Sequence, residues 1–125
     1  MVRAAALSAC VILAALAVFQ GALIGGAPIG RFAWGGQHEV LPTKLRVGSS
    51  ISIVLYLLFA LVLLTRAEVT AVVPDGIARL GAWLLAAYFT LGVVLNGASR
   101  SKPERYTFAP VSLVLAVLCF VVALS

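Results

Sequence analysis

The side chains that could do chemistry in this chain are few, and most of them lie between apolar stretches. His38 is the only histidine, and Glu39 follows it directly. A metal site takes three or four ligands, which two adjacent residues do not supply. The chain also lacks a Cys-x-x-Cys motif and a serine in a nucleophile-elbow setting. The sequence therefore predicts no metal, no cofactor and no catalytic residue.

His38 and Glu39 could instead recognise a charged group. Beside basic residues they could bind a phosphate or carboxylate headgroup, or glutamates and arginines of two connections could pair with one another. The candidate cluster at this face comprises Trp34, His38, Glu39, Arg46, Glu104 and Arg105. We expect a solvated turn anchored by Trp34 with ion pairs between connections, and an ion or anion gate is the alternative.

A second group of candidates lies within the apolar stretches. Its members are Ser52, Tyr56, Tyr88 and Asn96. The two tyrosines fall near the middle of their stretches, and a buried phenol usually needs a hydrogen-bond partner. Either each tyrosine bonds a neighbour in a tight helix seam, or both line a small polar cavity at mid-membrane, where transporter sites tend to lie.

Four long apolar stretches must position these residues. They run approximately over 4–25, 48–65, 77–96 and 108–124, and the single charged side chain within them is Arg79. A helix rises about 1.5 Å per residue, so about 20 residues cross a hydrocarbon core of about 30 Å. We therefore predict an all-α fold, a four-helix transmembrane bundle, with residues 1–125 forming a single membrane domain.

Composition supports a membrane protein. The chain is 63% hydrophobic and 10% charged, against about 25% charged in soluble domains, and a soluble fold this small could not bury so much apolar surface. The net charge of +5 comes from basic residues in or beside the connections. Since they can meet anionic lipid headgroups there, we expect the lipid bilayer as a partner and no nucleic acid.

The distribution of basic residues predicts the orientation. Six lie in the first and third connections, namely Arg31, Lys44, Arg46, Arg100, Lys102 and Arg105, against three in or beside the N-terminal tail and the second connection, namely Arg3, Arg66 and Arg79. Because short cytoplasmic loops carry the excess of Lys and Arg, we expect the first and third connections in the cytoplasm and both termini outside. An Arg-rich, Ala- and Val-rich composition favours a bacterial cytoplasmic membrane.

Small and weakly polar residues recur at spacings of three and four in every stretch, so each set shares one helix face. The sets are Cys10, Ala14, Ala17, Gly21 and Gly25; Ser49, Ser52, Tyr56 and Ala60; Gly81, Leu85, Tyr88, Gly92 and Asn96; and Ala109, Ser112, Ala116, Cys119 and Ala123. Membrane helices pack through such faces, so we expect all four sets to face inward, with Cys10 and Cys119 as packing residues and not as a disulfide.

Three motifs resemble those of a known family. They are Gly-x-Pro-x-Gly-x-x-x-Trp-Gly-Gly over 26–36, Leu-Pro-x-x-Leu-Arg-x-x-Ser over 41–49, and Asn-x-x-Ser-x-Ser-x-x-Glu-Arg-x-x-x-x-Pro over 96–110. Together they resemble a family of short four-span bacterial integral membrane proteins with no known activity. The resemblance covers nearly the whole chain. It implies a four-span membrane protein and its topology, but no mechanism.

Three functions fit these observations. The interpretation we favour is a non-enzymatic accessory or interaction subunit, acting through helix contacts at Gly21 and Gly25 as a homo-oligomer or with another membrane protein. The alternative is a small oligomeric transporter or channel with a mid-membrane site at Tyr56 and Tyr88, although acidic groups that mark most ion pathways are absent from the spans. A second alternative is a lipid-headgroup enzyme at the cytoplasmic face.

Overall fold

The structure, a computed structural model, describes residues 1–33, 36–38, 40–99 and 101–125. Its elements are the helices α1 (Val2–Ile24), α2 (Thr43–Arg66), α3 (Asp75–Gly97) and α4 (Lys102–Ala123), with the 3₁₀ helix η1 (Gly30–Phe32) in the first connection. Each of the four α-helices is long and apolar enough to cross a membrane. This confirms the predicted all-α four-helix transmembrane bundle.

All four helices begin before the apolar stretches do, two of them by more than a turn. α2 starts at Thr43 and not at residue 48, and α4 starts at Lys102 and not at residue 108. Hydropathy marks only the part of a helix inside the hydrocarbon, whereas local signals mark its end. At α4 the Ser101 Oγ accepts a hydrogen bond from the Glu104 N–H at 3.4 Å, and a proline lies in the first turn, which are typical signals of a helix start.

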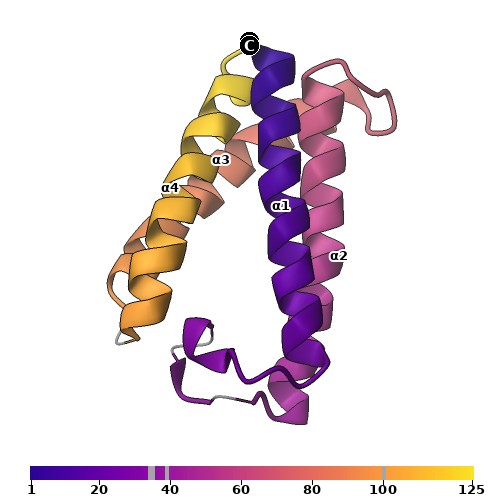
Figure 1. Cartoon of the computed structure of the whole chain (residues 1–125). Helices are drawn as coiled ribbons and strands as arrows, with labels where there is room; N and C mark the ends of the chain where they lie inside the picture. The colour runs from indigo at the N-terminus through magenta and orange to yellow at the C-terminus, as the bar shows by residue number, and fades with distance from the viewer. Residues whose placement is uncertain (34–35, 39, 100) are drawn as a thin grey trace.

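The helices form two antiparallel hairpins. α1 packs against α2 and α3 against α4, while α1–α4 and α2–α3 contacts join the hairpins. Figure 1 shows the hairpins meeting at the end that holds the chain termini and separating toward the other end. There the first connection passes beneath the bundle, and η1 contacts α4. We call these the closed end and the open end.

Small side chains build the closed end. Buried alanines of α1, α3 and α4 belong to one core cluster, namely Ala5, Ala6, Ala9, Ala82, Ala86, Ala116 and Ala123. α2 and α3 approach so closely that a Cβ added to Gly81 would lie 2.8 Å from Cγ1 of Val62. Short side chains allow this approach, which is how membrane helices gain packing energy without a hydrophobic drive between them.

The predicted inward face is buried in α4 except at half-buried Ala109, whereas part of the predicted face of α1 is exposed. The α4 residues Ser112, Ala116, Cys119 and Ala123 are buried. In α1, by contrast, Ala14, Gly21 and Gly25 are exposed, and nothing lies within 4 Å of a Cβ built at Gly21. The sequence has two small-residue faces on this helix, and α1 turns the other one, with the three buried alanines of its first half, toward the core. The inward placement of Gly21 and Gly25 was therefore wrong.

Candidate functional site

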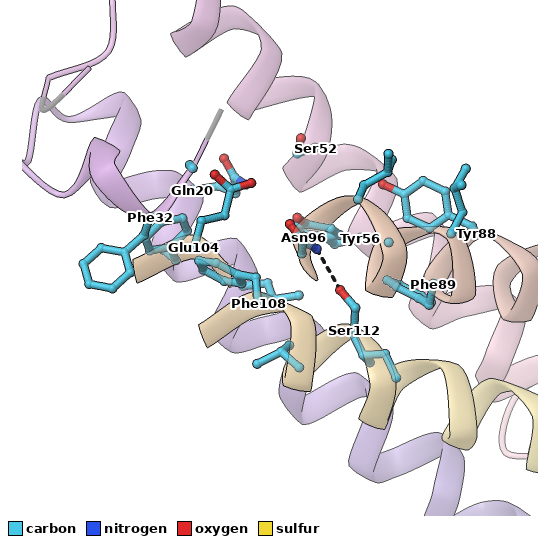
Figure 2. Close-up of a pocket in the computed structure, with 18 residues that line it drawn as sticks. Gln20, Phe32, Ser52, Tyr56, Tyr88, Phe89, Asn96, Glu104, Phe108 and Ser112 are labelled. Carbon is cyan, nitrogen blue, oxygen red and sulfur yellow. Dashed lines mark hydrogen bonds between the residues drawn. The ribbon is translucent and has the colours of Figure 1, made fainter. Parts of the chain in front are cut away.

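A cavity of about 370 Å³ lies between the separated hairpins, in the open-end half of the bundle. All four helices and η1 contribute to its walls, and it extends from Phe32 at the first connection to Leu115 near mid-height of α4. Ser52, Tyr56, Tyr88 and Asn96 all line it. The structure thus brings the four interior polar candidates together around one space (Figure 2).

Asn96 and Ser112 form the fixed polar contact of this cavity. The Asn96 Nδ2 donates a hydrogen bond to the Ser112 Oγ at 3.0 Å, drawn as a dashed line in Figure 2. Gly92 lies one turn before Asn96, and a Cβ there would be 3.3 Å from the same Oγ. The absence of a side chain at Gly92 therefore lets α3 and α4 approach closely enough for the Asn96 amide to reach across.

Ser52 is satisfied within its own helix and does not bind a tyrosine. Its hydroxyl donates to the Gly48 carbonyl at 3.1 Å, the backbone contact that helical serines commonly make. The Ser52 oxygen therefore contributes a weakly polar patch to the cavity wall.

The two tyrosines belong to an aromatic group and do not face each other directly. Phe59 stands between them, with its ring centroid 6.4 Å from that of Tyr56 and 5.5 Å from that of Tyr88. Phe89 adds a ring 5.1 Å from Tyr88. Tyr88 is 52% exposed, so the expectation that both tyrosines face inward holds for half-buried Tyr56 but was wrong for Tyr88, which lies at the cavity rim.

Gln20 is a cavity residue that the sequence interpretation did not include among its candidates. It lines the cavity from α1 and interacts with the Tyr56 side chain, while its Oε1 is buried without a hydrogen-bond partner. Its signal in the sequence was that it is the one strongly polar side chain of the first apolar stretch. An unsatisfied buried acceptor is costly, and a water molecule or another donor would satisfy it.

Glu104 also lines the cavity, although it was expected in the surface cluster. It lies in the first turn of α4, which is helical here because α4 begins at Lys102. A negative side chain in that position also interacts favourably with the positive end of the helix dipole. Because α4 begins earlier than predicted, the Glu104 carboxylate lies on a helix that lines the cavity and not in a loop.

Of the remaining members of the predicted surface cluster, those that the structure describes do not line the cavity. Trp34 and Glu39 lie outside the described residues, and His38 is exposed and does not line the cavity. The Arg105 guanidinium carbon lies 5.0 Å from the Tyr106 ring centroid, a cation–π contact. No group of three His, Cys, Asp or Glu side chains within the described parts of the chain could hold a metal ion.

Arg46 has a structural role in the first connection. Its Nε donates to the Leu41 carbonyl at 2.8 Å, and a Cβ built at Gly26 would lie 3.4 Å from its Nη2. Gly26 has φ +91, a conformation that glycine adopts without strain. Arg46 therefore joins both ends of the connection that crosses the open end.

The closed end carries a smaller cavity and no disulfide. Its volume is about 190 Å³, and Arg66, Glu68, Asp75 and Arg79 contribute to its lining. Arg66 also donates to the Ser125 carbonyl. Cys10 and Cys119 are both free thiols.

The fold and the cavity together define a small multi-pass membrane protein with four spans and a cavity in one half of the bundle. No protein-family model, no curated protein and no solved structure shows a significant match to the chain. The arrangement of its own residues therefore carries the functional argument.

Proposed function

We propose that this protein binds a small amphiphilic molecule in the open-end cavity and acts as a small, non-enzymatic transporter. The observation that carries the proposal is a space of about 370 Å³ that reaches the middle of the bundle. Ligand pockets of about 300–1,000 Å³ combine apolar and aromatic walls with a few placed polar groups. Here aromatic rings and leucines surround Gln20, Asn96 and Glu104.

The α3 wall supports access from the lipid. Tyr88, Leu91 and Leu95 line the cavity and are each more than half exposed. They lie farther along α3 than Gly81, whose close contact with Val62 of α2 belongs to the closed end. An apolar tail could therefore enter sideways from the bilayer, while the alanine-rich closed end blocks passage beyond mid-height.

The proposed setting is a bacterial cytoplasmic membrane, in which the chain would belong to the family of short four-span proteins that its motifs resemble. With the basic first and third connections in the cytoplasm, the cavity would face the cytoplasmic half of the bilayer and both termini would lie outside. Passage to the other side would then need a second state in which the closed end opens.

Thiol labelling with ligand protection tests the proposal. In a Cys10→Ala, Cys119→Ala background reconstituted into liposomes, we expect Tyr56→Cys to react with a water-soluble methanethiosulfonate and 4-phenylbutanol to slow the reaction. Leu85→Cys, which replaces a residue that is 5% exposed in the packed core, should stay unreactive, and Gln37→Cys in the exposed connection should react without protection. A Tyr56→Cys protein as inert as Leu85→Cys would refute an accessible cavity.

One observation favours a second function, the interaction subunit. The exposed α1 face formed by Ala14, Gly21 and Gly25 offers the small side chains through which membrane helices associate. Gly21→Leu should weaken a homo-oligomer or a complex with another membrane protein in crosslinking experiments. Ala15→Leu is the matched control, because Ala15 is exposed on another side of the same helix. Equal crosslinking of both variants would exclude this face as the interface.

A further inference from the structure

Resting on the proposed binding function, we propose that the ligand of the open-end cavity is a small aromatic amphiphile with one or two rings, and not an amphiphile with a saturated tail. The aromatic side chains of the cavity wall, their mutual geometry and the volume that they enclose support this class of substrate, as does the proposed access from the bilayer.

Aromatic residues are concentrated in the cavity wall. They make up 9% of the chain but six of the 18 residues that line the cavity. The six are Phe19, Phe32, Tyr56, Tyr88, Phe89 and Phe108. They come from all four α-helices and η1, so the fold gathers rings from distant parts of the sequence around one space.

The rings form two groups on opposite sides of the cavity. Figure 2 shows Phe32 and Phe108 on one side and Tyr88 and Phe89 on the other. The centroids of Phe19 and Phe108 lie 5.1 Å apart with an interplanar angle of 53°, and those of Tyr88 and Phe89 lie 5.1 Å apart at 78°. Aromatic rings prefer such edge-to-face contacts, with centroids about 4.5–7 Å apart. A ligand ring between the two groups would therefore extend a packing pattern that the wall already contains.

Entry from the bilayer makes these ring contacts decisive for selectivity. Lipid tails are as apolar as leucine, so an amphiphile that moves from the bilayer into the cavity gains little from burial of its apolar surface. Ring contacts are favourable beyond the burial of area, and saturated lipid chains do not provide them. A saturated tail therefore gains little over the bilayer, whereas an aromatic ring gains the contacts with both groups.

The volume of the cavity limits the size of the ligand. An apolar protein cavity of about 150 Å³ binds one benzene molecule, and the open-end cavity has a volume of about 370 Å³. The space therefore accommodates one ring with a short chain, or two rings. A phospholipid with two long acyl chains is too large to enter whole, so the volume also favours a small aromatic molecule over a membrane lipid.

Two probes that differ in the saturation of the ring test this inference. They are 4-(4-fluorophenyl)butan-1-ol and trans-4-(4-fluorocyclohexyl)butan-1-ol, followed by ¹⁹F NMR titration into the intact protein in phosphatidylcholine nanodiscs. Empty nanodiscs give the partitioning of each probe, so that affinity is expressed relative to probe dissolved in lipid. Both probes carry the same hydroxyl, so a polar partner such as the buried Gln20 Oε1 contributes equally. We expect the phenyl probe to bind about tenfold more tightly, which corresponds to 1.4 kcal/mol.

The outcomes separate this inference from the function on which it rests. If neither probe binds more than it does to empty nanodiscs, the proposed binding function fails. If the two probes bind equally, or the cyclohexyl probe binds better, the cavity binds amphiphiles but the aromatic class is overturned. Palmitoyl lysophosphatidylcholine should leave the bound phenyl probe in place. Its displacement by this lipid would overturn the inference in favour of a single-chain membrane lipid.

Matched variants locate the ring contacts. Phe19→Leu and Phe108→Leu each remove one ring and should reduce the preference for the phenyl probe about threefold, whereas Phe108→Tyr keeps the ring and should retain the preference. Phe120→Leu makes the same change outside the cavity, where Phe120 pairs with Trp83 at 6.0 Å, and should leave the preference intact. The preference is a ratio within one variant, so a general loss of packing affects both probes alike. A preference that survives both cavity leucine variants would overturn the assignment of the ring contacts.

Discussion

A close contact between the two hairpins predicts that alanine at position 81 destabilises the bundle. A Cβ there would lie 2.8 Å from Cγ1 and 3.6 Å from Cγ2 of Val62. Non-bonded carbon atoms prefer about 3.5–4.0 Å, so the new methyl group would be about 0.7 Å too close to Cγ1. Val62 is β-branched and has one strongly preferred rotamer in a helix, so α2 and α3 must move apart.

The size of the effect follows from two opposing contributions. Overpacking costs about 1–3 kcal/mol, whereas alanine is favoured over glycine in a helix by about 0.8–1.0 kcal/mol. We therefore expect Gly81→Ala to lower the free energy of unfolding by about 1 kcal/mol. Gly21→Ala is the control, because nothing lies within 4 Å of its Cβ, and it should leave stability unchanged or raise it.

Reversible unfolding in mixed micelles, titrated with sodium dodecyl sulfate and followed by circular dichroism, measures both variants. Val62→Ala removes the two methyl groups that Gly81→Ala would meet. In a double-mutant cycle the cost of Gly81→Ala should therefore disappear in the Val62→Ala background. Equal stability of Gly81→Ala and Gly21→Ala, or a cost that persists without the valine methyl groups, would refute the close packing of the closed end.

Three further substitutions test other parts of the fold. Asn96→Leu removes the 3.0 Å hydrogen bond to Ser112 and should lower the free energy of unfolding by about 1 kcal/mol in the same titration. Arg46→Gln removes the bond to the Leu41 carbonyl and should accelerate hydrogen exchange in the first connection. Pro110→Ala, at an exposed position inside α4, should raise stability, because it restores an N–H donor for the carbonyl four residues earlier.

Two of these have a control within the chain. Thr90→Val removes an exposed hydroxyl that bonds only its own helix and should cost less than Asn96→Leu. Lys44→Gln removes a neighbouring exposed charge and should leave exchange in the first connection unchanged. If Pro110→Ala lowers stability, the proline is favoured by contacts that its backbone position does not reveal.

The four spans and part of the cavity wall could be predicted from the sequence. Length and apolarity identify four helices, and short connections make successive helices antiparallel neighbours. Ser52, Tyr56 and Asn96 could be assigned to the interior because helical spacing places them on the same faces as small residues. These features depend on one helix at a time, which is why single-sequence patterns reveal them.

Features that depend on how helices meet could not be predicted in this way. α1 carries two small-residue faces, and only packing against α4 decides that Ala6 and Ala9 face the core while Gly21 does not. Tyr88 lies on the predicted face, yet it packs against Phe59 of α2 at the cavity rim and is half exposed. Glu104 enters the cavity because α4 begins within a polar segment that hydropathy assigns to a loop.

Side-chain size along the bundle nevertheless explains why a cavity forms and where it lies. The distance between packed helices depends on the side chains at their contact. Alanines meet at the closed end, whereas phenylalanine, tyrosine and leucine side chains line the space at the open end. Helices that touch through small residues at one end and large ones at the other must diverge, and irregular packing of large rings leaves space between them. The same gradient holds the closed end shut, so opening that end for transport would require the alanine contacts and the Gly81–Val62 contact to separate.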